Sequence, residues 1–216
     1  MFEVESVEPS NYGEEKRYFC EQEGQTCEVY YGLKEVPKEW IEALWDAYDE
    51  SLHIEEAIQE QACFTRESFI SALKDPEYNK IVMTVDGVIA GFLMGTTNLE
   101  KARIGYINPR FIQDRFPQEV EERRFWYMPC FFAASHVRHL GFIKMMVLAA
   151  IDAIRENKYV LALDVSNSRM YVSDMLVKLG EEAGFPIEKL LLGSQTYFAY
   201  RPVLDRESCK IEEVKP

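Results

Sequence analysis

The sequence is short of positive charge. Its 216 residues hold 24 Lys and Arg against 37 Asp and Glu, which gives a formal net charge of −13 at pH 7. A protein that binds nucleic acid needs a positive field to meet the phosphates. We therefore expect no nucleic-acid partner, and we expect neutral or cationic partners instead.

The sequence also lacks an apolar run long enough to cross a membrane. The longest nearly uncharged stretch, residues 81–99, is interrupted by Asp86-Gly87, a pair typical of a β-hairpin turn. The first ten residues, MFEVESVEPS, are acidic and have no apolar centre, so we expect no signal peptide and no membrane association.

Cysteine is too scarce and too irregularly spaced for a disulfide framework. There are five cysteines, an odd number. Cys20 and Cys27 are close enough in sequence to pair or to bind a ligand, but no second Cys or His pair at the spacing of a zinc site accompanies them. We therefore expect reduced thiols, a cytoplasmic protein and no metal site.

What the sequence does contain is enough apolar and aromatic residues, 47% and 13%, for one good core. Residues 1–26 are polar and predict an N-terminal arm, and residues 205–216 predict a polar C-terminal tail. Between them we expect a single domain, 27–204, with a partly helical insertion at about 98–124.

Apolar periodicity and turn residues predict the elements of this domain. Strands are predicted at 27–33, 80–85, 88–95, 124–134 and 159–165, with two more within 189–204, and helices at 38–52, 65–75, 140–154 and 166–184. The strand–helix–strand unit at 125–165 requires a parallel pair by the right-handed crossover rule. The predicted fold class is α/β (α+β): a mixed, mostly antiparallel sheet with a splayed parallel pair and helices on both faces.

The loop SHVRHLGFIKMM, residues 135–146, joins a strand to a long apolar helix. The first amides of a helix have no partner within it, and the helix dipole is positive there, so these amides bind phosphate where glycine leaves the backbone open. Arg138 supplies a positive charge, and Gly141 leaves the backbone accessible because it has no side chain. The amides of residues 139–143 can point at an anion. In the preceding strand, Pro129 cannot donate a ladder hydrogen bond and predicts a bulge.

From residue 28 to residue 202 the chain resembles the GNAT superfamily of acyl-coenzyme A-dependent N-acyltransferases. The phosphate loop of that superfamily reads Arg/Gln-x-x-Gly-x-Gly/Ala; here Arg138 and Gly141 match, and Ile143 stands at the last small position. The resemblance implies acetyl-CoA or another acyl-CoA as co-substrate, with its pantetheine arm bound by the bulged strand. The residues that it implies for coenzyme binding are Phe132, Ala133, Ala134, Arg138, His139, Leu140, Gly141, Phe142 and Ile143.

The superfamily often carries Tyr-x-x-x-Gly-Phe at the end of its next helix, where the tyrosine protonates the leaving thiolate. Gly184-Phe185 matches, but Gly180 occupies the tyrosine position, and Ser173 stands where asparagine is common. Tyr171, one turn into the same helix, is the candidate replacement acid. The alternative for Tyr171 is a packed ring with its hydroxyl at the surface.

The leading hypothesis is an enzyme that transfers an acyl group, in the first place acetyl, from coenzyme A to the amine of a small molecule or amino acid derivative. Two alternatives stay open. Ile143 and Gly180 motivate a catalytically silent acyl-CoA sensor or scaffold. The aromatic segment 106–116 motivates an N-acyl synthase that takes its chain from acyl-carrier-protein. The sequence fixes neither the acceptor nor the oligomeric state, and a homodimer is left open.

Overall fold

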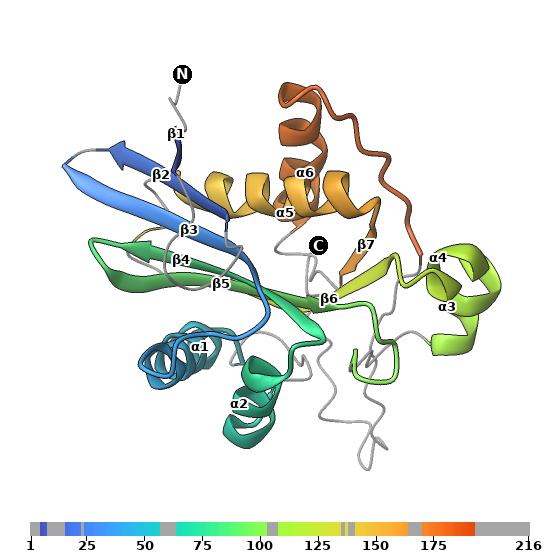
Figure 1. Cartoon of the computed structure of the whole chain (residues 1–216), viewed down its shortest axis with the longest axis horizontal. Coiled ribbons are helices and arrows are strands. Elements are labelled where there is room, and N and C mark those ends of the chain that lie inside the picture. Colours follow the sequence, from blue (N-terminus) through green and yellow to red (C-terminus); the bar gives the residue numbers. More distant parts are fainter. Residues whose placement is uncertain are drawn as a thin grey trace, which may run out of the picture.

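A seven-stranded sheet with helices on both faces forms the centre of the protein (Figure 1). This computed structural model describes residues 5–7, 16–22, 24–56, 64–102, 108–134, 137, 141–163 and 170–192. The strands are β1 (Glu5–Val7), β2 (Lys16–Gln22), β3 (Gln25–Leu33), β4 (Tyr78–Val85), β5 (Val88–Thr96), β6 (Phe125–Ala133) and β7 (Val160–Leu163). The helices are α1 (Trp40–Glu56), α2 (Arg66–Lys74), α3 (Pro109–Arg115), α4 (Pro117–Glu121), α5 (Ile143–Asn157) and α6 (Met170–Glu182).

The strands lie in the order of the chain, β1 to β7, and this order confirms the predicted fold class. Neighbouring strands from β1 to β6 are antiparallel, and β6 pairs with β7 in parallel. Helix α5 makes the crossover between the two parallel strands. In Figure 1, α5 and α6 lie on one face of the sheet, and α1 and α2 lie on the other. The predicted splay of β6 from β7 would fall beyond Leu163, on residues 164–169, which lie outside the described residues.

The N-terminal segment contributes to the sheet, although the sequence predicted an arm there. Strand β2 pairs along its length with β3, from Lys16↔Tyr31 to Gln22↔Gln25, and β1 pairs with β2. The polar residues of KRYFCEQ obscure an alternating pattern in which Cys20 is buried. The division of the chain into arm, domain and tail stays a prediction.

Local signals set the element boundaries as predicted. Asp86 and Gly87 have φ values of 50° and 77°, the left-handed conformations that a tight hairpin between β4 and β5 requires. Thr65 caps α2 by accepting a hydrogen bond from the N–H of Ser68. Gly184, with φ of 70°, follows the end of α6.

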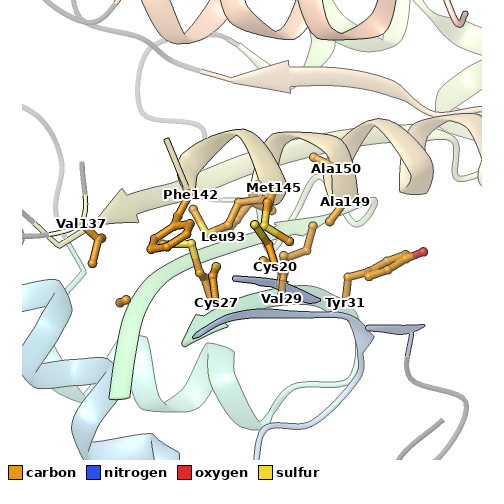
Figure 2. Packing of buried hydrophobic residues seen from close by; sticks show 14 of the residues in the cluster. Cys20, Cys27, Val29, Tyr31, Leu93, Val137, Phe142, Met145, Ala149 and Ala150 are labelled. Atoms are coloured by element: carbon orange, nitrogen blue, oxygen red, sulfur yellow. The ribbon is translucent and has the colours of Figure 1, made fainter. Parts of the chain in front are cut away.

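One core fills the space between the sheet and α5. Figure 2 shows side chains of β2 and β3 pointing toward those of α5 and its first turn. The labelled residues of this cluster are Cys20, Cys27, Val29, Tyr31, Leu93, Val137, Phe142, Met145, Ala149 and Ala150. Burial raises the pKa of the Cys27 thiol to about 12, so this thiol stays protonated at neutral pH.

A second core lies under α1 and α2 on the opposite face. Tyr48 stacks on Phe69, with ring centroids 4.6 Å apart, and meets Phe132 of β6 edge-on at 6.0 Å. The insertion is partly helical, as predicted: α3 and α4 cover a third cluster in which Phe116 packs on Phe125, with ring centroids 5.2 Å apart.

Two further observations concern the predicted elements. Residues 189–192, where a strand was predicted to begin, are not in a strand, and the remainder of that segment lies outside the described residues. In the described part of the chain, the helices are too short or too polar to span a lipid bilayer.

Candidate active site

Strand β6 is interrupted where Pro129 predicted it. Thr96 of β5 pairs with Tyr127, and Met94 pairs with Cys130, so Met128 and Pro129 together face Gly95 alone. This is a β-bulge, in which one strand carries an extra residue and bends. The parallel ladder between β6 and β7 ends, within the described residues, at the pair Met128↔Leu163. The bulge therefore coincides with the last described pair of the parallel strands.

The first turn of α5 presents unpaired donors. Gly141 has φ of 76°, a left-handed conformation that glycine adopts without strain. In the described part of the chain, no acceptor bonds the N–H groups of Gly141, Phe142 or Ile143, and no side chain caps the helix. Donors of this kind, together with the positive end of a helix dipole, are the groups that bind anions at helix starts.

The predicted loop residues divide into two groups. Arg138, His139 and Leu140 lie outside the described residues. Phe142 is 1% exposed and belongs to the core beneath α5. Ile143 packs against the cluster that α5 and α6 share, so its bulk is taken up between the two helices.

The predicted residues of β6 are largely committed to the fold. The Phe132 ring is buried under α1, and Ala133 pairs with Gly91 of β5. Ala134 donates its N–H to the carbonyl of Ala90 at 2.9 Å and accepts a hydrogen bond from the N–H of Val137 at 3.2 Å. The backbone N–H of Ala134 is therefore used within the fold, and the binding of a pantetheine arm by residues 132–134 stays a prediction.

Position 180 of α6, where the resemblance places a tyrosine, has no room for a side chain. A Cβ at Gly180 would lie 2.7 Å from the carbonyl oxygen of Phe185 and 2.9 Å from Cδ1 of Ile187, so no tyrosine fits there. The chain folds back over Gly180 because the N–H of Phe185 donates to the Gly180 carbonyl at 2.8 Å. Tyr171 lies in the first turn of α6, and its side chain lies outside the described part of the chain.

An apolar cavity lies beside the bulge, between β5, β6, β7, α5 and α6. Its volume is about 20 Å³, close to that of one water-sized probe, and it has no polar lining. The lining residues are Leu93, Met128, Phe131, Val147, Ala150, Leu163 and Leu176. Met128 and Leu163, the last described parallel pair, are both among them.

A groove between α5 and α6 opens at the start of α5. The exposed Lys144 of α5 lines it opposite Lys178 of α6. Lys178 is 3.8 Å from Glu182, a distance at which an exposed ion pair contributes little. Asp174 and Glu182 line the same groove, so it carries side chains of both charges.

A polar group on the opposite face was not found by sequence reasoning. Glu28 and Tyr30 of β3 lie on the face that α1 covers, and the Tyr30 hydroxyl donates to Glu28 Oε2 at 2.9 Å. Thr84 of β4 pairs directly with Glu28. The alternation of CEVYYGL already places Glu28 and Tyr30 on one face, but only the tertiary structure pairs Glu28 with Thr84.

A charged network at the other end of the sheet is structural. Lys101 bonds Asp75 and Glu77, each at 2.5 Å, and Arg123 bonds Glu77 at 3.1 Å. Lys101, Asn98 and Arg123 lower the pKa of Glu77 to about 2. The buried Lys80 donates to the carbonyls of Lys34 and Asp75, and burial lowers its pKa to about 8. These contacts join β3, β4, the loop after β5 and the turn before β6.

The chain is similar to several solved acetyltransferase structures, all at low identity. An aminoglycoside acetyltransferase from an uncultured soil metagenomic sample, in complex with trehalose, is 9% identical, with a TM-score of 0.48 over 82% of this chain and 97% of that one. The aminoglycoside enzyme AAC(6′)-Iy, in complex with a bisubstrate analogue, is 13% identical, with a TM-score of 0.45 over 80% and 99%. A ribosomal-protein-alanine N-acetyltransferase from Brucella melitensis is 12% identical, with a TM-score of 0.43 over 81% and 99%.

No protein-family profile matches the sequence, and no curated protein matches it either. The fold is instead evident in the chain's own topology. The antiparallel strands β3 to β6, the two helices after β3, and the parallel pair joined by α5 are the arrangement that the sequence resemblance implied. By the order and direction of its strands and helices, this chain has the GNAT fold.

Proposed function

We propose that this protein transfers an acyl group, in the first place acetyl, from an acyl-coenzyme A to the amine of a small molecule or amino acid derivative. The observation that carries the proposal is the alignment of two features. The bulge at Pro129 lies where the described parallel ladder ends. The N–H groups of Gly141, Phe142 and Ile143, which no acceptor among the described residues bonds, follow at the start of α5. A strand with interrupted pairing can accept hydrogen bonds from a thioester arm, and helix amides can bind its phosphates.

The coenzyme would bind by its phosphates first. We assign the pyrophosphate to the start of α5, with Arg138, His139 and Leu140 completing the loop and Lys144 adding charge. The apolar cavity beside Met128 and Leu163 would adjoin the acyl end of the thioester. Its small volume, about 20 Å³, favours a short acyl group such as acetyl.

The reaction would join the acceptor nitrogen to the carbonyl carbon and break the carbon–sulfur bond. The nitrogen loses a proton, and the departing thiolate gains one to leave as coenzyme A. We propose Tyr171 as the acid that supplies this proton, because Gly180 leaves no room for a tyrosine at the usual position. Positioning of the two substrates would supply much of the remaining rate enhancement.

Calorimetric titration of the protein with acetyl-CoA tests the first step, and binding below millimolar concentration is expected. Release of free thiol in the presence of a panel of amines tests the second. Tyr171→Phe should lower kcat and leave the dissociation constant of acetyl-CoA unchanged. Absence of binding at millimolar acetyl-CoA would end the proposal.

A second candidate is a catalytically silent protein that binds acyl-CoA as a sensor or scaffold. The close approach of Phe185 and Ile187 to Gly180 favours it, since this contact removes the usual acid. Coenzyme binding without thiol release for any amine would select the sensor. Faster release from a C12 than from a C2 donor would instead select the N-acyl synthase.

We further propose a cytoplasmic protein with a small-molecule acceptor and no nucleic-acid partner. The described cysteines Cys20, Cys27 and Cys130 are free thiols, which suits a reducing compartment. The net charge of −13 suits a cationic acceptor better than an anionic polymer.

A further inference from the structure

We infer that Glu28, Tyr30 and Thr84 form a subsite for an ammonium group on the sheet face that α1 covers. The binding of a cation there does not depend on catalysis. The assignment of this cation as a second amino group of the acceptor rests on the proposed function.

The first observation is an unsatisfied hydroxyl. Thr84 is 2% exposed, and its Oγ1 has no hydrogen-bond partner within the described residues. A buried hydroxyl without a partner destabilises a fold, whereas valine has the same shape without the polar atom. A hydroxyl in this position is therefore better suited to a ligand that arrives from outside than to the folded chain itself.

The second observation is the carboxylate beside this hydroxyl. Glu28 and Thr84 are direct partners on the antiparallel strands β3 and β4, so their Cβ atoms are about 5 Å apart on the same face. Glu28 Oε2 accepts a hydrogen bond from the Tyr30 hydroxyl at 2.9 Å, which orients the carboxylate. A carboxylate has about four acceptor positions, so it can take a ligand N–H in addition to its bonds within the protein.

The side chains of Glu28, Tyr30 and Thr84 are of the types that bind a cation. A carboxylate and a hydroxyl oxygen can both accept hydrogen bonds from an ammonium N–H. The Tyr30 ring meets the Trp40 ring edge-on, with centroids 5.1 Å apart, and both side chains are half-buried. Aromatic faces next to a carboxylate favour an organic ammonium ion over a hydrated metal ion.

The subsite lies on the same sheet face as the Cys130 and Phe132 side chains, which follow the bulge on β6, but on a different strand. Glu28 on β3 is three strand spacings from β6, about 14 Å across the sheet. An amine held at Glu28 is therefore not the one that attacks a thioester beside Pro129. The acceptor class that spans this distance is an extended molecule with at least two amino groups.

The binding test uses the full chain and 1,8-diaminooctane, titrated by NMR at two salt concentrations. Glu28→Gln should weaken binding at least tenfold, and Thr84→Val should weaken it severalfold. Glu21→Gln, which removes the same charge from an exposed position on β2, should change binding less than twofold. Circular dichroism melts verify that each variant is folded.

Equal weakening by Glu28→Gln and Glu21→Gln would overturn the subsite, since the effect would then be that of net charge alone. So would unchanged binding in Glu28→Gln, or no binding by the unaltered chain. A thiol-release assay with the same diamine separates the two proposals. If binding depends on Glu28 but no thiol is released, the proposed acyl transfer is wrong and the ammonium subsite is supported. If thiol is released and Glu28→Gln leaves the KM for the diamine unchanged, the acyl transfer is supported and the subsite is wrong.

Discussion

Gly95 of β5 lies directly against the indole of Trp126 of β6, so closely that a side chain at position 95 would overlap the indole nitrogen. A Cβ there would also lie 2.7 Å from Cε2 of Trp126 and 3.0 Å from the carbonyl oxygen of Tyr127. Gly95 is the residue that faces the bulge of Met128 and Pro129. Because Gly95 has no side chain, the fully buried indole of Trp126 can pack against β5 next to the bulge.

Gly95→Ala should therefore destabilise the fold by about 1–3 kcal/mol, the usual cost of overpacking a rigid core. The matched control is Gly91→Ala on the same strand. Its Cβ would meet Sδ of Met146 at 2.8 Å and Cε of Met83 at 2.9 Å, which are ends of flexible side chains that can move. Urea denaturation of the two variants is the measurement, and an equal loss in both would contradict the special position of Gly95.

Lys144→Glu should weaken coenzyme binding by roughly tenfold at low salt, because it places a negative charge beside the proposed phosphate position. The same change should leave stability unchanged or slightly higher, since a carboxylate near a helix N-terminus favours the helix. Lys158→Glu, the same charge change at the C-cap of α5, is the control. Calorimetry with coenzyme A would contradict the proposed site if both variants lost affinity equally.

Glu77 should support the fold at neutral pH and cease to do so in acid. Its pKa is lowered to about 2, chiefly by hydrogen bonds from Lys101, so the folded state favours the charged form. The stabilisation is complete above the ordinary glutamate range, near pH 4.5, and is lost as the pH falls toward 2. Thermal melts of Glu77→Gln should thus show a smaller fall in Tm between pH 5 and pH 2.5 than the unaltered chain. Glu121→Gln, an exposed change on α4, should melt like the unaltered chain at every pH.

Lys80 should also make stability rise with pH, but in an alkaline window. Burial lowers its pKa from 10.5 to about 8, so between these values the unfolded chain binds more protons than the folded one. Stability relative to Lys80→Met should then rise with pH across this window, by at most about 3 kcal/mol. At pH 7 the variant should be less stable by about 1–3 kcal/mol, because the carbonyls of Lys34 and Asp75 lose their donor. A pH-independent difference between the two proteins would contradict the lowered pKa.

Thr84→Val should leave stability unchanged or raise it by up to about 1 kcal/mol, because the change removes a buried hydroxyl that bonds nothing in the described chain. Chemical denaturation without added amine is the measurement. A clear loss of stability would mean that the hydroxyl has a partner in solution, and would remove the first argument for the ammonium subsite.

The hairpin at Asp86-Gly87, the cap at Thr65, and the bulge at Pro129 follow from the sequence, because each depends on backbone preferences that single residues carry. The amphipathic pattern of α5 and the strand–helix–strand spacing likewise determine a parallel pair. These local rules are sufficient to predict the fold class and to place the loop with Gly141 at the start of α5.

Only the tertiary structure decided how the remaining residues are used. The sequence did not reveal strand β2, because its polar residues obscure the alternation and its pairing partner is known only in the fold. The lack of space at Gly180 depends on the return of Phe185 over α6, and the meeting of Glu28 with Thr84 depends on a register between strands more than fifty residues apart in the sequence. Side-chain periodicity is a property of a single segment, so the sequence alone determined the helices, the strands and the fold class. Contact between segments is set by packing, so only the tertiary structure decided which polar groups lie next to one another.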